Sequence, residues 1–189
     1  MNAPSLFYSP AASLAAVDLS YAADGWPATG QPSACAVAGN TLYVVVSAAP
    51  NGSTTTVYAA ANPNALPTDA VGLSWSAVAM LVMPGSGATG FALSGDSLSL
   101  FVAASEGGVF RATRATMTTP FSAFVANAAT IGVPASDVLV NANGLTVYVL
   151  TPFSLATIDL RGDWATAPLV NVTTAANDGT VFLGVALSP

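Results

Sequence analysis

Short apolar runs, separated by glycine, asparagine, aspartate and proline, dominate the hydrophobic pattern of this chain. Typical runs are T-L-Y-V-V-V from Thr41, L-S-L-F-V-A from Leu98 and L-T-V-Y-V-L from Leu145. Runs of this length that are rich in β-branched and aromatic residues predict β-strands. Because no segment combines a sustained helical period with capping residues, the pattern predicts an all-β protein.

The expected strands repeat along the chain. The segment F-A-L-S-G-D-S-L-S-L-F-V from Phe91 matches V-L-V-N-A-N-G-L-T-V-Y-V from Val138, 47 residues later, without a gap. Another step of 47 residues reaches Val185, in V-A-L-S-P. Toward the N-terminus, A-G-N at 38–40 corresponds to S-G-D at 94–96 after a longer interval, which insertions in loops would explain. Self-similarity at this period predicts a repeat fold, with the strands that begin near Cys35, Phe91, Val138 and Val185 equivalent and innermost.

The two ends of the chain carry parts of one further repeat. S-L-A-A-V-D-L from Ser13 resembles S-L-A-T-I-D-L from Ser154, which lies 141 residues or three repeats later. Each segment follows a Ser/Thr-Pro pair and precedes a tryptophan beside Asp and Gly, Trp26 in the first case and Trp164 in the second. A repeat that is split between the termini would pair the open edges of a ring of sheets.

This split repeat makes a specific structural prediction. Gly184–Leu187 should form a strand in one sheet with residues 6–8 and 15–19, from this chain or from a neighbouring copy. Only 19 residues separate Asp18 from the next inner strand at Val37, which leaves little room for an outer strand. Either this unit has three strands or the chain is a piece of a larger ring.

Units of this kind resemble the blades of β-propellers. V-N-A-N-G-L-T-V-Y-V-L-T-P from Val140, followed by S-L-A-T-I-D-L, is similar to blades of the YVTN, NHL and WD40-like kinds. The Gly-His and Trp-Asp signatures of WD40 repeats are absent, as is the Asp-box spacing of sialidase-like propellers. The resemblance implies an all-β fold, a small β-propeller of about four blades or a fragment of a larger one. The expected single domain, 1–189, has repeats at about 31–85, 86–131, 132–178, and 179–189 plus 1–30.

Charge and hydropathy exclude two classes of partner. Three arginines, no lysine and nine acidic residues give a net charge of -6, which is the wrong sign for neutralising phosphates, so no nucleic acid is expected. Although 53% of residues are hydrophobic, the longest apolar run is Ala77–Met83, which is too short for a membrane-spanning helix. No basic segment followed by an apolar stretch opens the chain, although a mature chain that had lost a signal peptide would look the same.

The chemistry-bearing residues are few. The absence of histidine and lysine removes the commonest general base and every Schiff-base mechanism. Paired carboxylates could still hydrolyse glycosides. Asp137 and Asp178 precede inner strands and Glu106 follows a second strand, so all three are expected on one face, where carboxylates could hold Ca²⁺. No other cofactor is expected.

Most other polar candidates have a structural interpretation. Asp96 occupies the turn position that Asn40 and Asn143 hold in other repeats, where a short side chain caps a tight turn. Cys35, among apolar neighbours, is expected to be a buried core thiol. Asp18 and Asp159 are equivalent within their strands. The remaining candidates for packing or partner contact are two tryptophans and two arginines: Trp26, Trp164, Arg111 and Arg114.

With charged residues at only 6% of the chain, little repulsion keeps copies or partners apart. The leading hypothesis is therefore a non-catalytic binding or structural module that uses loop faces or the side of the ring. It would hold a protein or a glycan, or assemble with copies of itself. Two alternatives remain: a propeller-type hydrolase of a glycoside or lactone with a carboxylate/Ca²⁺ site, and a polysaccharide or surface binder. Such a composition suits an extracellular or cell-surface setting.

Overall fold

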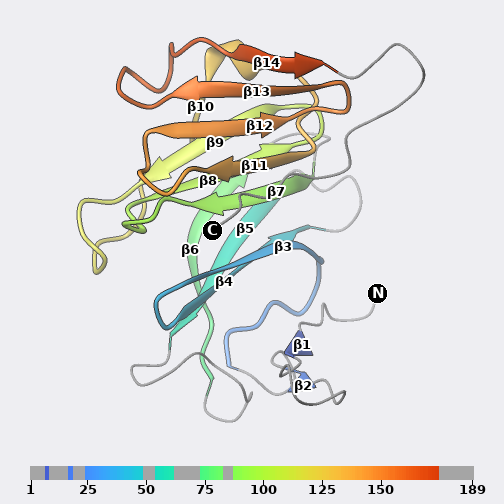
Figure 1. Ribbon diagram of the computed structural model, residues 1–189. Coiled ribbons are helices and arrows are strands. Elements are labelled where there is room, and N and C mark those ends of the chain that lie inside the picture. The colour runs from blue at the N-terminus through green and yellow to red at the C-terminus, as the bar shows by residue number, and fades with distance from the viewer. Residues whose placement is uncertain are drawn as a thin grey trace.

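The computed structural model describes residues 7–8, 17–18, 24–48, 54–61, 73–82 and 87–174. Within these ranges, three four-stranded antiparallel sheets follow one another along the chain, and a two-stranded sheet lies near the N-terminus (Figure 1). Each four-stranded sheet uses its strands in sequence order, as the blades of a propeller do. The predicted all-β, blade-like architecture is therefore confirmed.

The strands have the following bounds. Blade 1 contains β3 (Gln31–Ala38), β4 (Thr41–Ser47), β5 (Thr54–Ala61) and β6 (Ser76–Val82). Blade 2 contains β7 (Ala88–Leu93), β8 (Ser99–Ala104), β9 (Gly108–Thr113) and β10 (Val125–Ala126). Blade 3 contains β11 (Asp137–Val140), β12 (Thr146–Leu150), β13 (Ser154–Asp159) and β14 (Val170–Thr174). The short strands β1 (Phe7–Tyr8) and β2 (Val17–Asp18) form the fourth sheet, and a 3₁₀ helix, η1 (Ala128–Thr130), lies between blades 2 and 3.

The pairing register reproduces the repeat of 47 residues in blades 2 and 3. Leu93 lies opposite Leu100 across β7 and β8, and Val140 lies opposite Val147 across β11 and β12. Both members of the second pair are 47 residues after those of the first, so the two hairpins have the same geometry. The repeat therefore holds for individual cross-strand contacts as well as for the spacing of apolar runs.

The first hairpin of blade 1 departs from that register. Ala38 lies opposite Thr41, which leaves a two-residue turn of Gly39 and Asn40, with Gly39 at φ +56°. The corresponding turns of blades 2 and 3 run over 94–99 and 141–146. The matching letters A-G-N and S-G-D thus belong to turns of different length, and the predicted equivalence of Asn40 with Asp96 is wrong.

The first strands of the three blades lie side by side. β7 contacts β3 on one side and β11 on the other, whereas β6, β10 and β14 end their sheets. A Cβ at Gly90 in β7 would lie 2.7 Å from the Cα of Asp137 and 2.9 Å from the backbone nitrogen of Val138, so this approach requires glycine. The prediction of equivalent innermost strands is confirmed for those near Cys35, Phe91 and Val138, while Val185 lies outside the described residues.

Apolar side chains fill the spaces between neighbouring blades. β8 is buried on both faces: Val102 belongs to the cluster between blades 1 and 2, and Phe101 to the cluster between blades 2 and 3. Full burial of side chains of this size contributes about 1.5–3 kcal/mol each. A third cluster covers the opposite face of blade 1, with Val44, Val46, Ala60, Leu73 and Trp75 buried and Trp26 packed against them. Blade 2 is therefore the central layer of the described structure.

Cys35 lies in β3 and is exposed, so its predicted burial is wrong. The reason is its position in the series of blades. Phe91 and Val138 hold the equivalent places in β7 and β11 and are 7% and 0% exposed, because a preceding blade packs against them. Among the described residues, no blade precedes blade 1, and the neighbouring Val37 is also 54% exposed.

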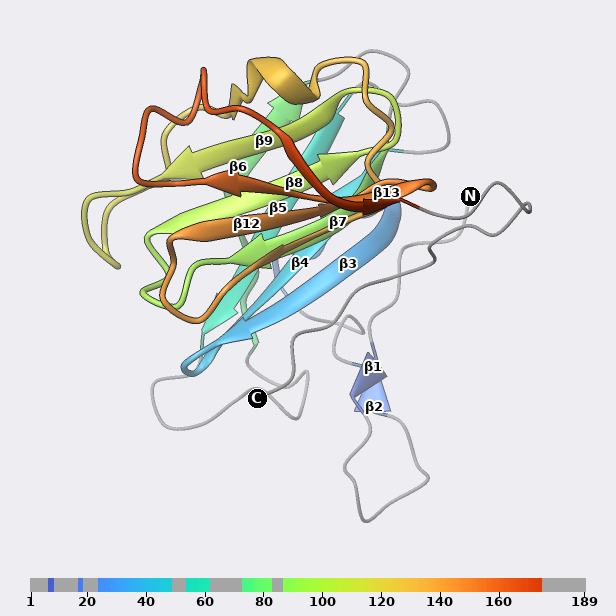
Figure 2. The same ribbon diagram turned by 45° about the horizontal axis from the view of Figure 1, so that its top comes forward.

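The N-terminal strands pair as the split repeat predicts. Phe7 lies opposite Asp18 and Tyr8 opposite Val17, in antiparallel orientation. In blade 3, Asp159 follows Asp18 by 141 residues, but its partner Thr146 follows Phe7 by 139, so the antiparallel pairing is reproduced with a register that differs by two residues. Figure 2 shows β1 and β2 as a unit apart from the three blades. The predicted strand Gly184–Leu187 lies outside the described residues.

Candidate functional site

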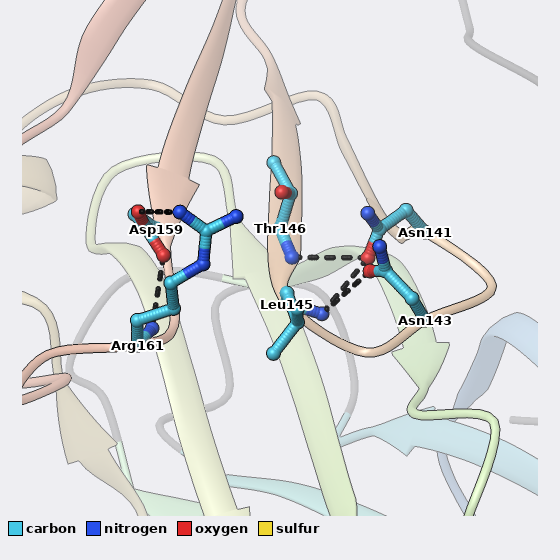
Figure 3. A network of polar contacts seen from close by, with 6 residues as sticks. All are labelled: Asn141, Asn143, Leu145, Thr146, Asp159 and Arg161. Atoms are coloured by element: carbon cyan, nitrogen blue, oxygen red, sulfur yellow. Dashed lines mark hydrogen bonds and ion pairs between the residues drawn. The ribbon is translucent and has the colours of Figure 1, made fainter.

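The most ordered polar surface lies where the first and second strands of each blade are joined, and we call it the turn end. In blade 3, the side-chain oxygen of Asn141 accepts hydrogen bonds from the backbone nitrogens of Leu145 and Thr146, each at 3.0 Å (Figure 3). Asn143 Oδ1 also accepts from Leu145 N, at 3.0 Å. Gly144 takes the positive φ of +70° that closes the turn. Two amide side chains therefore fix this backbone.

Blade 2 builds the same turn from different residues. Ser94 Oγ accepts from Ser99 N at 2.9 Å, and Asp96 Oδ1 accepts from Leu98 N at 2.9 Å. The Ser94 hydroxyl also donates to Asp96 Oδ1 at 2.6 Å, and Ser97 holds the positive φ, at +58°. The bonds from the Ser94 hydroxyl and from Leu98 N lower the pKa of Asp96. The predicted turn role of Asp96 and Asn143 is confirmed.

The two turns are neighbours in space. A Cβ at Gly95 would lie 3.2 Å from the carbonyl oxygen of Ala142. Each turn is held by side-chain bonds of its own, and the close approach joins them into one surface.

Arg114 connects this surface to blade 1. Its guanidinium donates to the carbonyl oxygens of Ser97 at 2.9 Å and Met117 at 3.1 Å, and to Tyr43 Oη at 3.2 Å. The guanidinium carbon also lies 4.4 Å from the ring centre of Phe121. Because Tyr43 belongs to blade 1 and the other partners to blade 2, Arg114 stabilises the junction between these blades. A direct role for Arg114 in holding a partner stays a prediction.

Arg111 is also held by blade 2. Its Nε and Nη2 donate to Ser99 Oγ at 3.3 and 2.9 Å, and its guanidinium carbon lies 5.7 Å from the ring centre of Phe101. Partial burial lowers the pKa of Arg111, an effect that the charge of Asp96 opposes. The side chain remains a cation at neutral pH, since the ordinary pKa of arginine lies far above neutrality. Its contact with a partner likewise stays a prediction.

Arg161 is a cation at the turn end that the sequence analysis did not single out. Its Nη1 lies 3.7 Å from Asp159 Oδ2, and both side chains are largely exposed, at 71% and 58%. Asp159 Oδ1 accepts from the backbone nitrogen of Arg161 at 2.9 Å (Figure 3). Asp159 thus has the expected structural role, whereas an exposed ion pair of this kind contributes at most about 1 kcal/mol.

The predicted carboxylate site would lie at the opposite end of the blades, around Glu106 and Asp137. Glu106 lies in the turn between β8 and β9, and Asp137 is the first residue of β11. Asp137 Oδ1 accepts from Val138 N at 2.8 Å, and Gly90 of blade 2 lies against this carboxylate. Asp178 is outside the described residues. Within the described ranges, no three His, Cys, Asp or Glu residues form a group that could hold a metal ion. Calcium binding stays a prediction.

The tryptophans pack between strands as expected, but Trp26 and Trp164 do not occupy equivalent places in the structure. Trp164 lies edge-on to Phe101 of the preceding blade, with ring centres 5.5 Å apart, and its Nε1 donates to Val125 O at 2.7 Å. Trp75, in the same connection between the third and fourth strands of blade 1, is its structural counterpart. Trp26 lies edge-on to Trp75 at 4.7 Å and so takes the place that Phe101 has in blade 2. Stacking of a glycan on Trp26 or Trp164 stays a prediction.

A further surface follows the outermost strands β6, β10 and β14, and we call it the rim. The sequences of these strands, S-A-V-A-M-L-V, V-A and V-N-V-T-T, contain no charged residue and no proline. Each strand carries exposed apolar side chains, between 48% and 61% exposed: Met80, Val82, Val125, Val170 and Val172. The sequence analysis missed this feature, although its signal, uncharged strands outside the innermost set, was present.

Comparison with solved structures identifies the fold. The β-propeller domain of Cps50 (Swd1) from Myceliophteria thermophila matches with a TM-score of 0.52 and 10% identity, over 80% of this chain and 42% of that chain. Hydrazine synthase of Kuenenia stuttgartiensis matches with a TM-score of 0.45 and 16% identity, over 69% of this chain and 33% of that one. The chain thus spans less than half the length of these proteins.

No protein-family model and no curated protein sequence matches the chain. The described part of the chain contains no helix with the length and apolar character that a membrane crossing requires. The similarity to the Swd1 domain, together with the three four-stranded blades, shows a β-propeller fold.

Proposed function

We propose that this protein is a non-catalytic binding and assembly module, which associates with another protein or with copies of itself through its rim. The observation that carries the proposal is the exposed, uncharged set of outermost strands. Met80 and Val82 of β6 are each 61% exposed, and Val172 of β14 is 60% exposed. These side chains lie on strands whose outer edges have no partner strand among the described residues.

Edge strands of this kind favour pairing with another chain. An outermost strand presents a row of backbone donors and acceptors, and proteins that stay monomeric usually protect such an edge with lysine, proline or a bulge. β6 is seven residues long and has neither lysine nor proline, and its pairing with β5 has one irregularity, opposite Val57 and Tyr58. A partner strand could therefore add to β6 through main-chain hydrogen bonds while Met80 and Val82 supply apolar contact. This chemistry favours a protein partner over a glycan.

The electrostatics of the surface support association as well. The chain has no lysine and three arginines, and two of these, Arg111 and Arg114, are engaged by neighbouring groups in blade 2. The rim strands carry no charge at all. Repulsion between two approaching rims is consequently small, because like charges are the main force that keeps soluble proteins apart.

Charged substitutions on the rim test the proposal. The double variant Met80→Lys and Val172→Lys should reduce or abolish self-association, or the capture of a partner strand, while circular dichroism and thermal unfolding stay unchanged. Ile131→Lys is the matched control, because Ile131 is 64% exposed but lies outside the rim strands. Sedimentation velocity over a range of concentrations measures the association. Equal association of wild type, rim variant and control, or a wild type that stays monomeric and captures no strand peptide, would overturn the proposal.

A further inference from the structure

We propose that Met117 is a site of reversible oxidation by peroxides, and that Arg114 binds the oxygen that its sulfur gains. Met117 lies at the turn end, in the connection between β9 and β10 of blade 2. The proposal goes beyond association through the rim and does not rest on it, because the contacts that carry it lie outside the rim strands.

The sulfur of Met117 is already in contact with a cation. Arg114 Nη2 donates to Met117 Sδ at 3.0 Å, and Nη1 donates to the backbone carbonyl oxygen of the same residue at 3.1 Å. The guanidinium is also held by the Ser97 carbonyl oxygen, by Tyr43 Oη of blade 1 and by the ring of Phe121. Its position is therefore fixed by groups that do not change when the thioether reacts.

The backbone that carries Met117 is ordered as well. Thr119 N donates to the carbonyl oxygen of Thr116 at 3.1 Å, and Thr116 N donates to Thr119 Oγ1 at 2.9 Å. The Thr119 hydroxyl also donates to Thr116 O, at 2.9 Å. Met117 is thus a central residue of a closed turn, and its side chain starts from a fixed point beside the guanidinium.

An oxidant can reach this sulfur from solvent, because Met117 is 50% exposed. In the reaction, the sulfur donates an electron pair to one peroxide oxygen and the O–O bond breaks. The transferred oxygen passes its proton to the leaving oxygen, which departs as water or as an alcohol. The thioether is oxidised to a sulfoxide, and the peroxide is reduced by the same two electrons.

The product suits this place. A sulfoxide disrupts an apolar core because it is polar, whereas here the new oxygen lies beside a cation and water. A thioether sulfur is a weak acceptor, while a hydrogen bond from a guanidinium to an oxygen is a strong one. Because Sδ already lies at hydrogen-bond distance, the sulfur must withdraw toward solvent to admit the oxygen, which the three rotatable bonds of methionine allow. Oxidation should therefore strengthen the contact between Met117 and Arg114.

A stronger contact at Met117 acts on the junction of two blades. The nitrogen that faces the sulfur, Nη2 of Arg114, also donates to Tyr43 Oη in blade 1, at 3.2 Å. A terminal guanidinium nitrogen has two N–H groups, so it can serve both acceptors at once. A guanidinium fixed between the two acceptors loses its alternative positions, so oxidation should stabilise blade 1 against blade 2.

Met80 provides the matched comparison. It is exposed to a similar degree, 61%, but lies on the rim in β6. The three arginines of the chain are bonded to groups outside β6. A sulfoxide at Met80 therefore gains no guanidinium, and only the polarity of the side chain changes.

Two variants that differ in the retained methionine test the proposal. Both carry Cys35→Ser and Met83→Leu; one adds Met80→Leu and keeps Met117, and the other adds Met117→Leu and keeps Met80. Met1 is common to both and cancels in the comparison. After hydrogen peroxide treatment, peptide mass spectrometry should locate an added oxygen at the retained methionine. The thermal midpoint, measured at a dilution where rim contacts are negligible, should rise by about 2 °C in the Met117 protein and stay constant in the Met80 protein.

Reversal and mimicry complete the test. Methionine sulfoxide reductases of both epimer specificities, with a dithiol as reductant, should return the Met117 protein to its original mass and midpoint. Met117→Gln places a carbonyl oxygen on a side chain of similar length, so it should raise the midpoint without peroxide. Arg114→Lys should abolish that gain, because lysine lacks the planar fork of donors.

Four results would overturn the proposal. The first is a Met117 that stays unoxidised under peroxide that oxidises Met80. The second is a midpoint that is unchanged or lower after oxidation of Met117, and the third is an equal rise in the Met80 protein. The fourth is a gain from Met117→Gln that persists with Arg114→Lys, since Arg114 would then not bind the oxygen.

Discussion

Replacing Asn127 with alanine should destabilise the fold by about 2 kcal/mol. Asn127 is fully buried between blades 2 and 3, and its Nδ2 donates to the carbonyl oxygens of Trp164 at 2.8 Å and Ala167 at 2.9 Å. Each lost hydrogen bond costs about 0.5–1.5 kcal/mol, and the empty space adds to this. Asn127 Oδ1 has no partner among the described residues, so its removal offsets part of the loss.

The isosteric change Asn127→Asp should cost more at neutral pH, and the cost should depend on pH. A carboxylate here would face two carbonyl oxygens in a buried site, which raises its folded-state pKa above the unfolded value of about 3.9. The unfolded chain then loses its proton more readily, so the variant gains stability relative to wild type as the pH falls from 7 toward 4. Protonating the carboxyl at pH 7 costs about 1.4 kcal/mol per pH unit above 3.9. The difference in unfolding free energy between wild type and Asn127→Asp should therefore narrow by up to about 4 kcal/mol between pH 7 and pH 4.

Urea unfolding followed by tryptophan fluorescence, at pH 7, 6, 5 and 4, measures both effects. Asn143→Asp is the control, since Asn143 is exposed and the equivalent residue in blade 2 is Asp96. This change should cost less than about 0.5 kcal/mol. The reasoning is refuted if Asn127→Ala unfolds within about 0.5 kcal/mol of wild type, or if the deficit of Asn127→Asp is the same at every pH.

Two further changes test the innermost strands and the turn end. Gly90→Ala should lower the free energy of unfolding in urea by about 1–3 kcal/mol, because its Cβ would meet the backbone of blade 3. Gly162→Ala is the control and should be neutral, since a Cβ there has no atom within 4 Å. Equal effects of the two changes would contradict the close approach of β7 and β11. Asp96→Asn keeps the turn acceptor and should cost less than about 1 kcal/mol at pH 7. Because the folded-state pKa of Asp96 is lowered, the contribution of its carboxylate is present above the ordinary pKa of about 3.9 and is lost below it. The stability difference between wild type and Asp96→Asn should therefore disappear in acid, and a difference that persists would show another cause.

The strands and their register in blades 2 and 3 could be predicted from the sequence because each apolar position has one physical role. Phe91 and Val138 match in sequence since both must fill the space against a preceding blade. The same periodicity predicted the turn residues Asp96 and Asn143, because a short side chain with an acceptor oxygen can close this turn whether it is a carboxylate or an amide. Repetition therefore carried information about contacts as well as about strands.

The sequence-based predictions were wrong where the exposure or packing of a residue depends on neighbouring blades and strands and not on the local sequence. Cys35 stands among apolar residues, but its exposure depends on which segment precedes blade 1. The hairpin at Gly39 has letters that match S-G-D, yet its turn is four residues shorter than that of blade 2, which only the strand pairing reveals. Trp26 and Trp164 share sequence contexts, whereas their packing partners come from different connections. Side-chain networks such as that of Arg114 combine two blades and have no local signal.

The near absence of ion pairs has a consequence for the solvents in which this fold can persist. Among the residues that the structure describes, the single salt bridge is the exposed pair of Arg161 and Asp159. The turns are closed mainly by hydroxyl and amide oxygens, and the blades adhere through apolar contact. Dissolved salt screens charge–charge attraction but leaves neutral hydrogen bonds in place, and excluded anions such as sulfate strengthen apolar burial. The described blades should therefore lose little stability as ionic strength rises, and their unfolding midpoint in brine should be at least as high as in dilute buffer.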